Sequence, residues 1–281
     1  MKNQKIVTNP LYRIAVCLSG ELRTYKVVLP NIKSYFESIV PNFTDNTEIV
    51  IDYFIHTWNH NTWKSHETPG KNPKWQTPEP VEFEIDLIRR YLNVIEYRVD
   101  NHLTGVDLGV WKPLFYSMYY SNYLKRKHEI ENGFEYDMVF KHRLDIALNP
   151  VFKFHLHPIE NYIVYSGAHV GRMPHELNCY NFDDVIFYGT SLTMDLMSNI
   201  SRYLIEKTST PQLSWKNYNG NMSPLLLMGP GGLLYHYMMK MGFNPARPQI
   251  IEYIVVRKPV LELGLSTITE FEKVRYYHLN F

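Results

Sequence analysis

Unbroken apolar runs alternate with segments of helical periodicity along the first part of the chain. Residues 13–18 form a short, nearly continuous apolar run that ends at Ser19-Gly20, which indicates a strand covered on both faces. Residues 27–40 carry apolar side chains at helical spacing, with the helix expected to begin near Pro30, and residues 48–55 form a second apolar run. The order strand, helix, strand predicts a right-handed parallel crossover, with residues 13–18 as a central parallel strand.

The same alternation continues to the end of the chain. Further strands are predicted at residues 94–99, 136–146, 159–165, 184–188 and 250–256. Further helices are predicted at residues 82–92, from Pro113 to a stop at Gly133, at 192–204 and at 233–241. The cations Lys125-Arg126-Lys127 are expected in the last turn of the Pro113 helix, and Gly229-Pro230-Gly231-Gly232 is expected to be a loop.

No internal repeat, low-complexity tract or linker divides the chain, so the sequence predicts one domain over residues 1–281. The expected fold class is α/β, with a mostly parallel central sheet flanked by helices. A nucleotide-side half of about residues 1–150 and an acceptor-side half of about residues 151–281 are expected to meet near residue 150. Polar segments at 60–80, 101–109 and 208–223 are predicted to be surface loops.

The composition narrows the class of protein. A formal net charge of +1 over 281 residues gives no field that would attract a polyanion, so a nucleic-acid partner is not expected. The two cysteines, Cys17 and Cys179, exclude a disulfide framework and favour a reducing compartment. The polar N-terminus has no signal-peptide core, and the apolar stretch 225–243 is interrupted by glycines and by His236 and Lys240. We therefore expect a cytoplasmic protein without a transmembrane segment.

Three charged residues occupy alternate positions at the end of the predicted strand 136–146. Side chains at this spacing share a strand face, so Lys141, Arg143 and Asp145 should project together. Ligands of open α/β sheets bind beyond the carboxyl ends of the strands, where this trio is expected. Arginine and lysine would bind a diphosphate, and Asp145 could hold Mg²⁺ or Mn²⁺. The alternative interpretation is an internal ion pair between Arg143 and Asp145 that closes the strand end.

Two other strand ends carry candidate ligand-binding residues. Ser19, Gly20 and Arg23 follow the first strand, where a glycine permits close backbone approach and Arg23 could reach a phosphate or a base. Neither the G-x-G-x-x-G fingerprint nor a P-loop is present, so an ordinary turn is the competing interpretation. His56 and Trp58 end the second strand as substrate-binding candidates, and the indole could either stack on a base or sugar or pack against the sheet edge.

Carboxylates and histidines in the second half of the chain supply further candidates. Asp183 and Asp184 precede a predicted strand, so one of them could act as a base toward an acceptor hydroxyl, or both could simply cap a turn. His155 and His157, with His169 and His175 downstream, offer a conceivable zinc site, although ordinary loop histidines fit the same pattern. The chain has no G-x-S-x-G, H-E-x-x-H or H-R-D motif, which excludes the usual serine hydrolases, zincins and protein kinases.

The order of these segments resembles a family of GT-A-like glycosyltransferases found in bacterial surface-polysaccharide gene clusters and in viruses of microbes. The likeness covers most of the chain. The matching segments are Ile14-Ala15-Val16-Cys17-Leu18-Ser19-Gly20 with Arg23, Phe54-Ile55-His56-Thr57-Trp58, Ser117-Met118, Tyr136-Asp137-Met138-Val139, Arg143-Leu144-Asp145, Asp184 with Phe187-Tyr188-Gly189, and Met194-Asp195.

The resemblance implies a GT-A-like (Rossmann-like) fold and a polysaccharide-biosynthesis activity. The implied reaction moves a sugar from a nucleotide-diphosphate-sugar donor to a hydroxyl of a glycan or related acceptor. Arg143-Leu144-Asp145 would take the place of the metal-binding D-x-D motif, with Arg143 where the first Asp is expected. A Mn²⁺ or Mg²⁺ ion at Asp145 is then optional, because Arg143 itself could neutralise the leaving diphosphate. No acidic residue stands near Pro230, so Asp184 is the expected base, with Asp145 as the second catalytic carboxylate.

Two alternatives from other classes stay open. The incomplete metal motif is compatible with a catalytically silent nucleotide- or carbohydrate-binding protein on the same scaffold. A metal-dependent hydrolase would instead use His155, His157 and His169 with Asp183 or Asp184. Tightly bound zinc or iron would distinguish the hydrolase from the other two.

Overall fold

Seven strands form the central sheet of the computed structural model, in the order β3-β2-β1-β4-β8-β6-β9. The strands β1 (Leu11–Ser19), β2 (Glu48–Trp58), β3 (Val94–Asp100) and β4 (Met138–Arg143) are parallel to one another. The strand β8 (Ile186–Gly189) runs antiparallel to β4 and to β6 (Ile163–Ser166), and β9 (Asn244–Ala246) is parallel to β6. The structure describes residues 11–22, 24–39, 47–59, 81–100, 112–169, 182, 184–208, 229–247 and 251–255.

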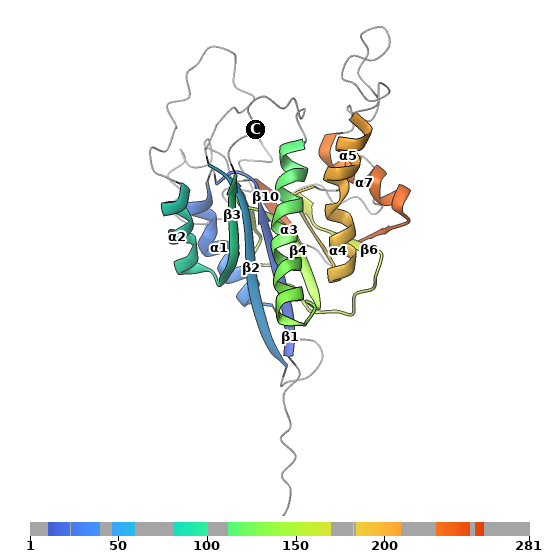
Figure 1. Ribbon diagram of the computed structural model, residues 1–281. Coiled ribbons are helices and arrows are strands. Elements are labelled where there is room, and N and C mark those ends of the chain that lie inside the picture. The colour runs from blue at the N-terminus through green and yellow to red at the C-terminus, as the bar shows by residue number, and fades with distance from the viewer. Residues whose placement is uncertain are drawn as a thin grey trace, which may run out of the picture.

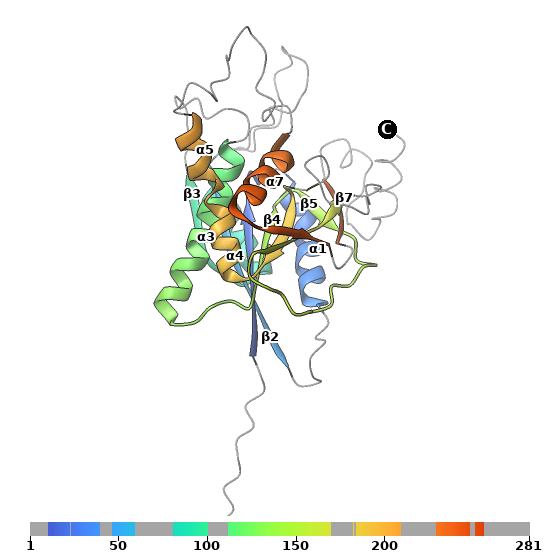
Figure 2. The same ribbon diagram turned by 90° about the vertical axis from the view of Figure 1, so that its right-hand side faces the viewer.

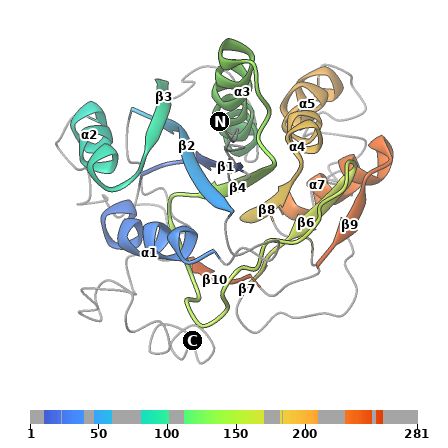
Figure 3. The same ribbon diagram turned by 90° about the horizontal axis from the view of Figure 1, so that it is seen from below.

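Helices cover both faces of this sheet (Figures 1 and 3). On one face lie α1 (Tyr25–Glu37) and α2 (Val81–Tyr91). On the other lie α3 (Lys112–Asn132), α4 (Ser191–Ser198), α5 (Ile200–Thr208) and α7 (Gly229–Met241). The described elements therefore form a single α/β domain with a mostly parallel, Rossmann-like sheet, as the sequence predicts. Within the described residues, no helix is both long enough and apolar enough to cross a membrane.

A second, small sheet lies beside α1, across the large sheet from α4 (Figure 2). Its order is β5 (Ile146–Leu148), β10 (Glu252–Val255), β7 (Ala168–His169). The side chain of Asn31 on α1 pairs with the backbone of Leu148 in both directions, donating to its oxygen at 2.8 Å and accepting from its nitrogen at 2.7 Å. This amide thus completes the backbone pairing of β5 and ties the small sheet to α1.

The hydrophobic core consists of two clusters, one on each face of the large sheet. Along β1, Val16 and Leu18 pack toward α1, whereas Ala15 and Cys17 pack toward α3. This burial on both faces explains why β1 is a continuous apolar run rather than an alternating one. The same holds for β4, where Phe140 belongs to the first cluster and its neighbour Val139 to the second.

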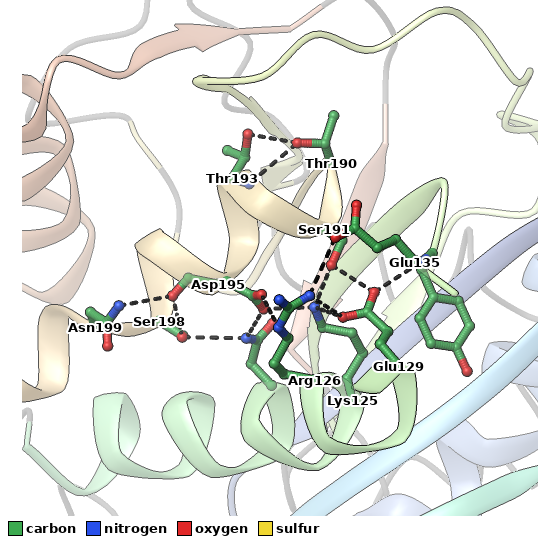
Figure 4. Close-up of polar contacts among 12 residues, drawn as sticks. Lys125, Arg126, Glu129, Glu135, Thr190, Ser191, Thr193, Asp195, Ser198 and Asn199 are labelled. Carbon is green, nitrogen blue, oxygen red and sulfur yellow. Dashed lines mark hydrogen bonds and ion pairs between the residues drawn. The ribbon is translucent and has the colours of Figure 1, made fainter. Parts of the chain in front are cut away.

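A buried ion network joins α3 to α4 (Figure 4). The Lys125 ammonium, whose side chain is 0% exposed, donates to Glu129 at 2.9 Å and to Asp195 and Ser191 at 2.6 Å each. Glu129 also accepts from the Ser191 hydroxyl at 2.6 Å, and Arg126 lies 3.5 Å from both carboxylates. The two cations and two carboxylates balance, which is what makes such burial tolerable.

Several predicted boundaries are wrong for identifiable reasons. Helix α1 begins at Tyr25 and encloses Pro30, because its buried apolar face starts a full turn before the proline. Helix α3 continues to Asn132, so the cations at 125–127 are not in its last turn, although Gly133 follows its end as predicted. Helix α7 begins at Gly229, where the first-turn N–H groups have no intrahelical partner and a proline is tolerated.

Two predicted single elements are divided in the structure. The strand expected at 136–146 becomes β4 and β5, separated by a turn at Leu144-Asp145. The helix expected at 192–204 becomes α4 and α5, because α4 ends at a C-cap on Asn199. Leu192, the first residue of the predicted helix, is 43% exposed.

Candidate functional site

The carboxyl ends of three parallel strands meet at one edge of the large sheet. Ser19, the last residue of β1, is in register with His56 on β2 and with Arg143 on β4. Register partners in a sheet point to the same face, which here is the face covered by α3. The structure thus brings together three of the residues that the sequence singles out, at the edge where open α/β sheets bind their ligands.

Arg143 and Asp145 form a two-point ion pair at this edge. The guanidinium donates from Nε to Oδ1 at 2.8 Å and from Nη2 to Oδ2 at 2.6 Å. The side chain of Asp145 is 4% exposed and that of Arg143 is 18% exposed. The internal ion pair considered from the sequence is therefore present, and it fixes the plane of the guanidinium.

The ion pair also affects whether Asp145 can bind the expected divalent cation. Both oxygens of Asp145 accept from Arg143, so a metal would have to displace at least one of these bonds. Across the part of the chain that the structure describes, no three His, Cys, Asp or Glu side chains gather closely enough to hold a metal ion. Among the described residues, the donor set around Asp145 does not fit Mg²⁺ or Mn²⁺, which prefer several oxygen ligands.

Lys141 lies in the interior rather than beside a ligand position. It is 1% exposed, and its ammonium donates to the backbone oxygens of Asp184 and, at 3.2 Å, of Val185. It therefore ties β4 to the segment that leads into β8. Because β8 is antiparallel to β4, this segment, with Asp184 at intermediate exposure, lies at the same sheet edge as Arg143. Arg23 and Asp183 lie outside the described residues.

The turn after β1 requires a glycine. Gly20 has a φ of +118°, a conformation that other residues rarely adopt, while a Cβ there would meet nothing within 4 Å. Its N–H donates to the Ser117 hydroxyl at 2.8 Å and to the His56 carbonyl at 3.2 Å. The neighbouring Ser19 hydroxyl is fully buried and has no hydrogen-bond partner among the described residues.

His56 and Trp58 are enclosed by α3. The His56 ring is 0% exposed and contacts Ser117 Oγ through Nδ1 at 2.8 Å and Asp100 Oδ2 through Nε2 at 3.2 Å. Burial lowers the pKa of His56 to about 4. Trp58 is 2% exposed, and its ring stacks on Tyr116 with centroids 5.4 Å apart. The indole thus packs at the sheet edge, and its contacts are with protein rings.

Asp100 and Ser117 are the members of this site that sequence reasoning missed. Asp100 ends β3 and accepts from Arg98 Nε at 2.8 Å and from the Tyr116 hydroxyl at 3.1 Å. Burial alone would raise the pKa of Asp100, but the hydrogen bonds from Arg98 and His56 outweigh it, and the pKa is lowered. Two features of the sequence could have pointed to them. Asp100 is an acidic residue just past a predicted strand, and Ser117 lies on the buried face of a predicted helix.

The histidines of the possible zinc site have other surroundings. His157 contacts the Tyr188 hydroxyl through Nε2 and the Pro158 carbonyl through Nδ1, both at 2.9 Å. His155 is exposed, His169 belongs to β7 in the small sheet, and His175 lies outside the described residues. Among the described residues these histidines form no metal-binding group.

The fold and the site define an α/β protein with a Rossmann-like sheet and a polar edge at the carboxyl ends of β1, β2 and β4. No protein-family model matches the chain, and no curated protein matches it. Among solved structures, the chain is similar to the nucleoside-diphosphate-sugar pyrophosphorylase from Vibrio cholerae RC9, with a TM-score of 0.38 and 11% identity. The similarity covers 92% of this chain and 98% of that chain.

Proposed function

We propose that this protein is a glycosyltransferase that moves a sugar from a nucleotide-diphosphate-sugar donor to a hydroxyl of a glycan or related acceptor. The observation that carries the proposal is the register of Ser19 with Arg143. It sets a glycine turn, where a ligand can approach the backbone closely, directly beside a guanidinium at the ligand edge of the sheet. A phosphate group is the ligand that this pair of features suits best.

Arg143 is the proposed diphosphate ligand. Asp145 fixes the guanidinium plane, so little side-chain freedom remains to be lost when an anion binds. During transfer the bond from the sugar carbon to the diphosphate breaks and a bond to the acceptor oxygen forms. Negative charge then accumulates on the leaving diphosphate, and a fixed guanidinium stabilises it. Asp184 is the proposed acceptor of the hydroxyl proton.

The proposal makes donor binding independent of a divalent cation, since Arg143 neutralises the diphosphate and Asp145 is committed to Arg143. Calorimetry and thermal shift with UDP-, GDP-, CMP- and dTDP-sugars, each with Mn²⁺ and with EDTA, test this. One donor should bind equally well in both conditions. No response to any donor would remove the donor-site assignment.

Variants identify the diphosphate ligand. Arg143→Ala should weaken donor binding at least tenfold, because it removes a charge-assisted contact. Lys33→Ala is the matched control, since it removes an exposed cation that pairs with Glu37 on α1. It should leave the affinity unchanged. If Arg143→Ala binds the donor normally while Asp145→Ala does not, Arg143 is not the diphosphate ligand.

A catalytically silent binding protein is the second candidate, and one observation favours it. Asp145, one of the two predicted catalytic carboxylates, is engaged by Arg143 through both oxygens. Release of nucleoside diphosphate from the tightest-binding donor, measured with and without a panel of glycan acceptors, separates the candidates. Binding without release in any combination would favour the silent protein.

A further inference from the structure

A chain of hydrogen bonds crosses the candidate site from the edge strand to the glycine turn. It runs from Asp100 on β3 to His56 on β2 at 3.2 Å, and from His56 to Ser117 on α3 at 2.8 Å. Ser117 in turn accepts from the N–H of Gly20 at 2.8 Å. Four separate segments of the chain therefore meet through three side chains and one backbone amide.

The partners determine the proton positions in this chain. The Asp100 carboxylate can only accept, so the facing Nε2 of His56 carries a proton. His56 is neutral at pH 7, because its pKa lies near 4, and its Nδ1 must then accept. The Ser117 hydroxyl, whose oxygen accepts from Gly20, is the donor that Nδ1 faces at 2.8 Å, and it shares its one proton with the His56 carbonyl at 3.1 Å. Each ring nitrogen of His56 thereby has a matched partner.

The same three residue types occur in the Ser-His-Asp arrangement of nucleophilic catalysis, but burial excludes that role here. Ser117 and His56 are both 0% exposed. The Ser117 oxygen is surrounded by the Gly20 nitrogen, the His56 ring and, at 3.1 Å, the His56 carbonyl. A substrate carbonyl has no approach to this hydroxyl, so the chain can act only on the groups that it holds.

The group held at its end is the turn that faces Arg143. Gly20 is kept at its φ of +118° by bonds from its N–H to Ser117 and to the His56 carbonyl. We infer that Asp100, His56 and Ser117 are positioning residues that fix the Ser19-Gly20 turn, and thereby the ligand edge beside Arg143. The identity of the ligand, a nucleotide-diphosphate sugar, rests on the proposed function.

A ligand-independent measurement tests the positioning itself. Ser117→Ala should speed hydrogen exchange of the Gly20 amide about tenfold, the effect of losing one good hydrogen bond. Ser121→Ala is the matched control, because Ser121 is a buried serine one turn further along α3 whose hydroxyl donates within the helix, to the Met118 carbonyl at 3.1 Å. It should leave Gly20 exchange unchanged. Equal exchange in the two variants would overturn the inference.

Asp100→Ala perturbs the other end of the chain, where the side chain is 18% exposed and folding is least threatened. It should also speed Gly20 exchange, although by less than Ser117→Ala. Nitrogen-15 NMR of the histidine rings should show the Nε2–H tautomer of His56 in the wild type at pH 7. The Nδ1–H tautomer would contradict the assigned direction of the chain and overturn the inference.

Donor affinity separates this inference from the proposed function. The nucleotide sugar that binds the wild type most tightly should bind Ser117→Ala about tenfold more weakly and Ser121→Ala with unchanged affinity. If no nucleotide sugar binds the wild type, the proposed function fails while Gly20 exchange still decides the positioning role. Faster Gly20 exchange with unchanged donor affinity would show that the turn does not form the ligand edge.

Discussion

Removal of the Lys125 ammonium should destabilise the protein far more than removal of a neighbouring exposed cation. Lys125→Met keeps the length of the side chain but leaves Glu129 and Asp195 without their nearest cation. Glu129 is 1% exposed, so its charge cannot be solvated in place. Breaking a buried ion pair in this way costs about 3–5 kcal/mol of the free energy of unfolding.

The lower end of that range is expected here. Arg126 stays 3.5 Å from both carboxylates and takes up part of their charge, although its side chain is 42% exposed. We therefore expect a loss of about 3 kcal/mol for Lys125→Met. The double variant Lys125→Met with Glu129→Gln should lose less than the sum of the single losses, because an uncharged amide needs no cation and can still accept from Ser191.

Urea denaturation followed by circular dichroism measures these differences. The matched control is Lys127→Met, two residues along the same helix, where the ammonium is 41% exposed and pairs with Glu96 at 2.5 Å. An exposed pair is screened by solvent, so this variant should unfold at nearly the wild-type urea concentration. If Lys125→Met and Lys127→Met unfold at the same concentration, the buried network does not join α3 to α4 energetically.

Two further predictions concern buried polar groups. Tyr136→Phe removes a hydroxyl that donates to the buried Asp52 at 2.7 Å. In urea denaturation this variant should lose about 1.5–3 kcal/mol of the free energy of unfolding. Tyr123→Phe, at an exposed tyrosine, is the control, and a smaller loss for Tyr136→Phe than for this control would contradict the prediction. His142 is fully buried, and among the described residues neither of its ring nitrogens has a side-chain partner. Burial lowers the pKa of His142 from 6.5 to about 3, so between these pH values the unfolded chain binds a proton that the folded protein does not. The stability of the wild type therefore falls as the pH drops below 6.5, and His142→Leu should gain about 2 kcal/mol relative to the wild type between pH 7 and pH 5. An equal difference between the two proteins at both pH values would refute this.

The sequence predicts the central strands and β10 well, but it misses β5 and β7 as separate strands. β1 and β2 are apolar runs because both of their faces are buried, and that is a local property of the sequence. The pairing of β5 with β10 is not local. Just after β5, the backbone N–H of Asn149 donates at 2.8 Å to the backbone carbonyl of Glu252, about a hundred residues further along the chain. Short strands of this kind depend on their pairing partners, so the residue pattern at 146–148 does not by itself predict a separate strand.

The same distinction between local and non-local information applies to the candidate site. The ends of β1, β2 and β4 could be predicted because side-chain direction and strand ends follow from the residue pattern alone. The partner of a side chain depends on which element packs against it. Lys141 has the periodicity that should place it with Arg143, but the nearby antiparallel strand β8 is preceded by the carbonyls of Asp184 and Val185, which take its ammonium. Ser117 meets Gly20 only because α3 crosses β1 and β2.

On the sequence alone, the ion pair between Arg143 and Asp145 is the alternative to a ligand site, yet the two interpretations are compatible. A guanidinium that is held in one plane by a carboxylate has already lost the freedom that an unpaired arginine would lose on binding. The same carboxylate also reduces the net charge that a diphosphate would meet. On the proposed function, Asp145→Asn should therefore keep more donor affinity than Arg143→Ala, because it relaxes the plane of the guanidinium but leaves the positive charge in place.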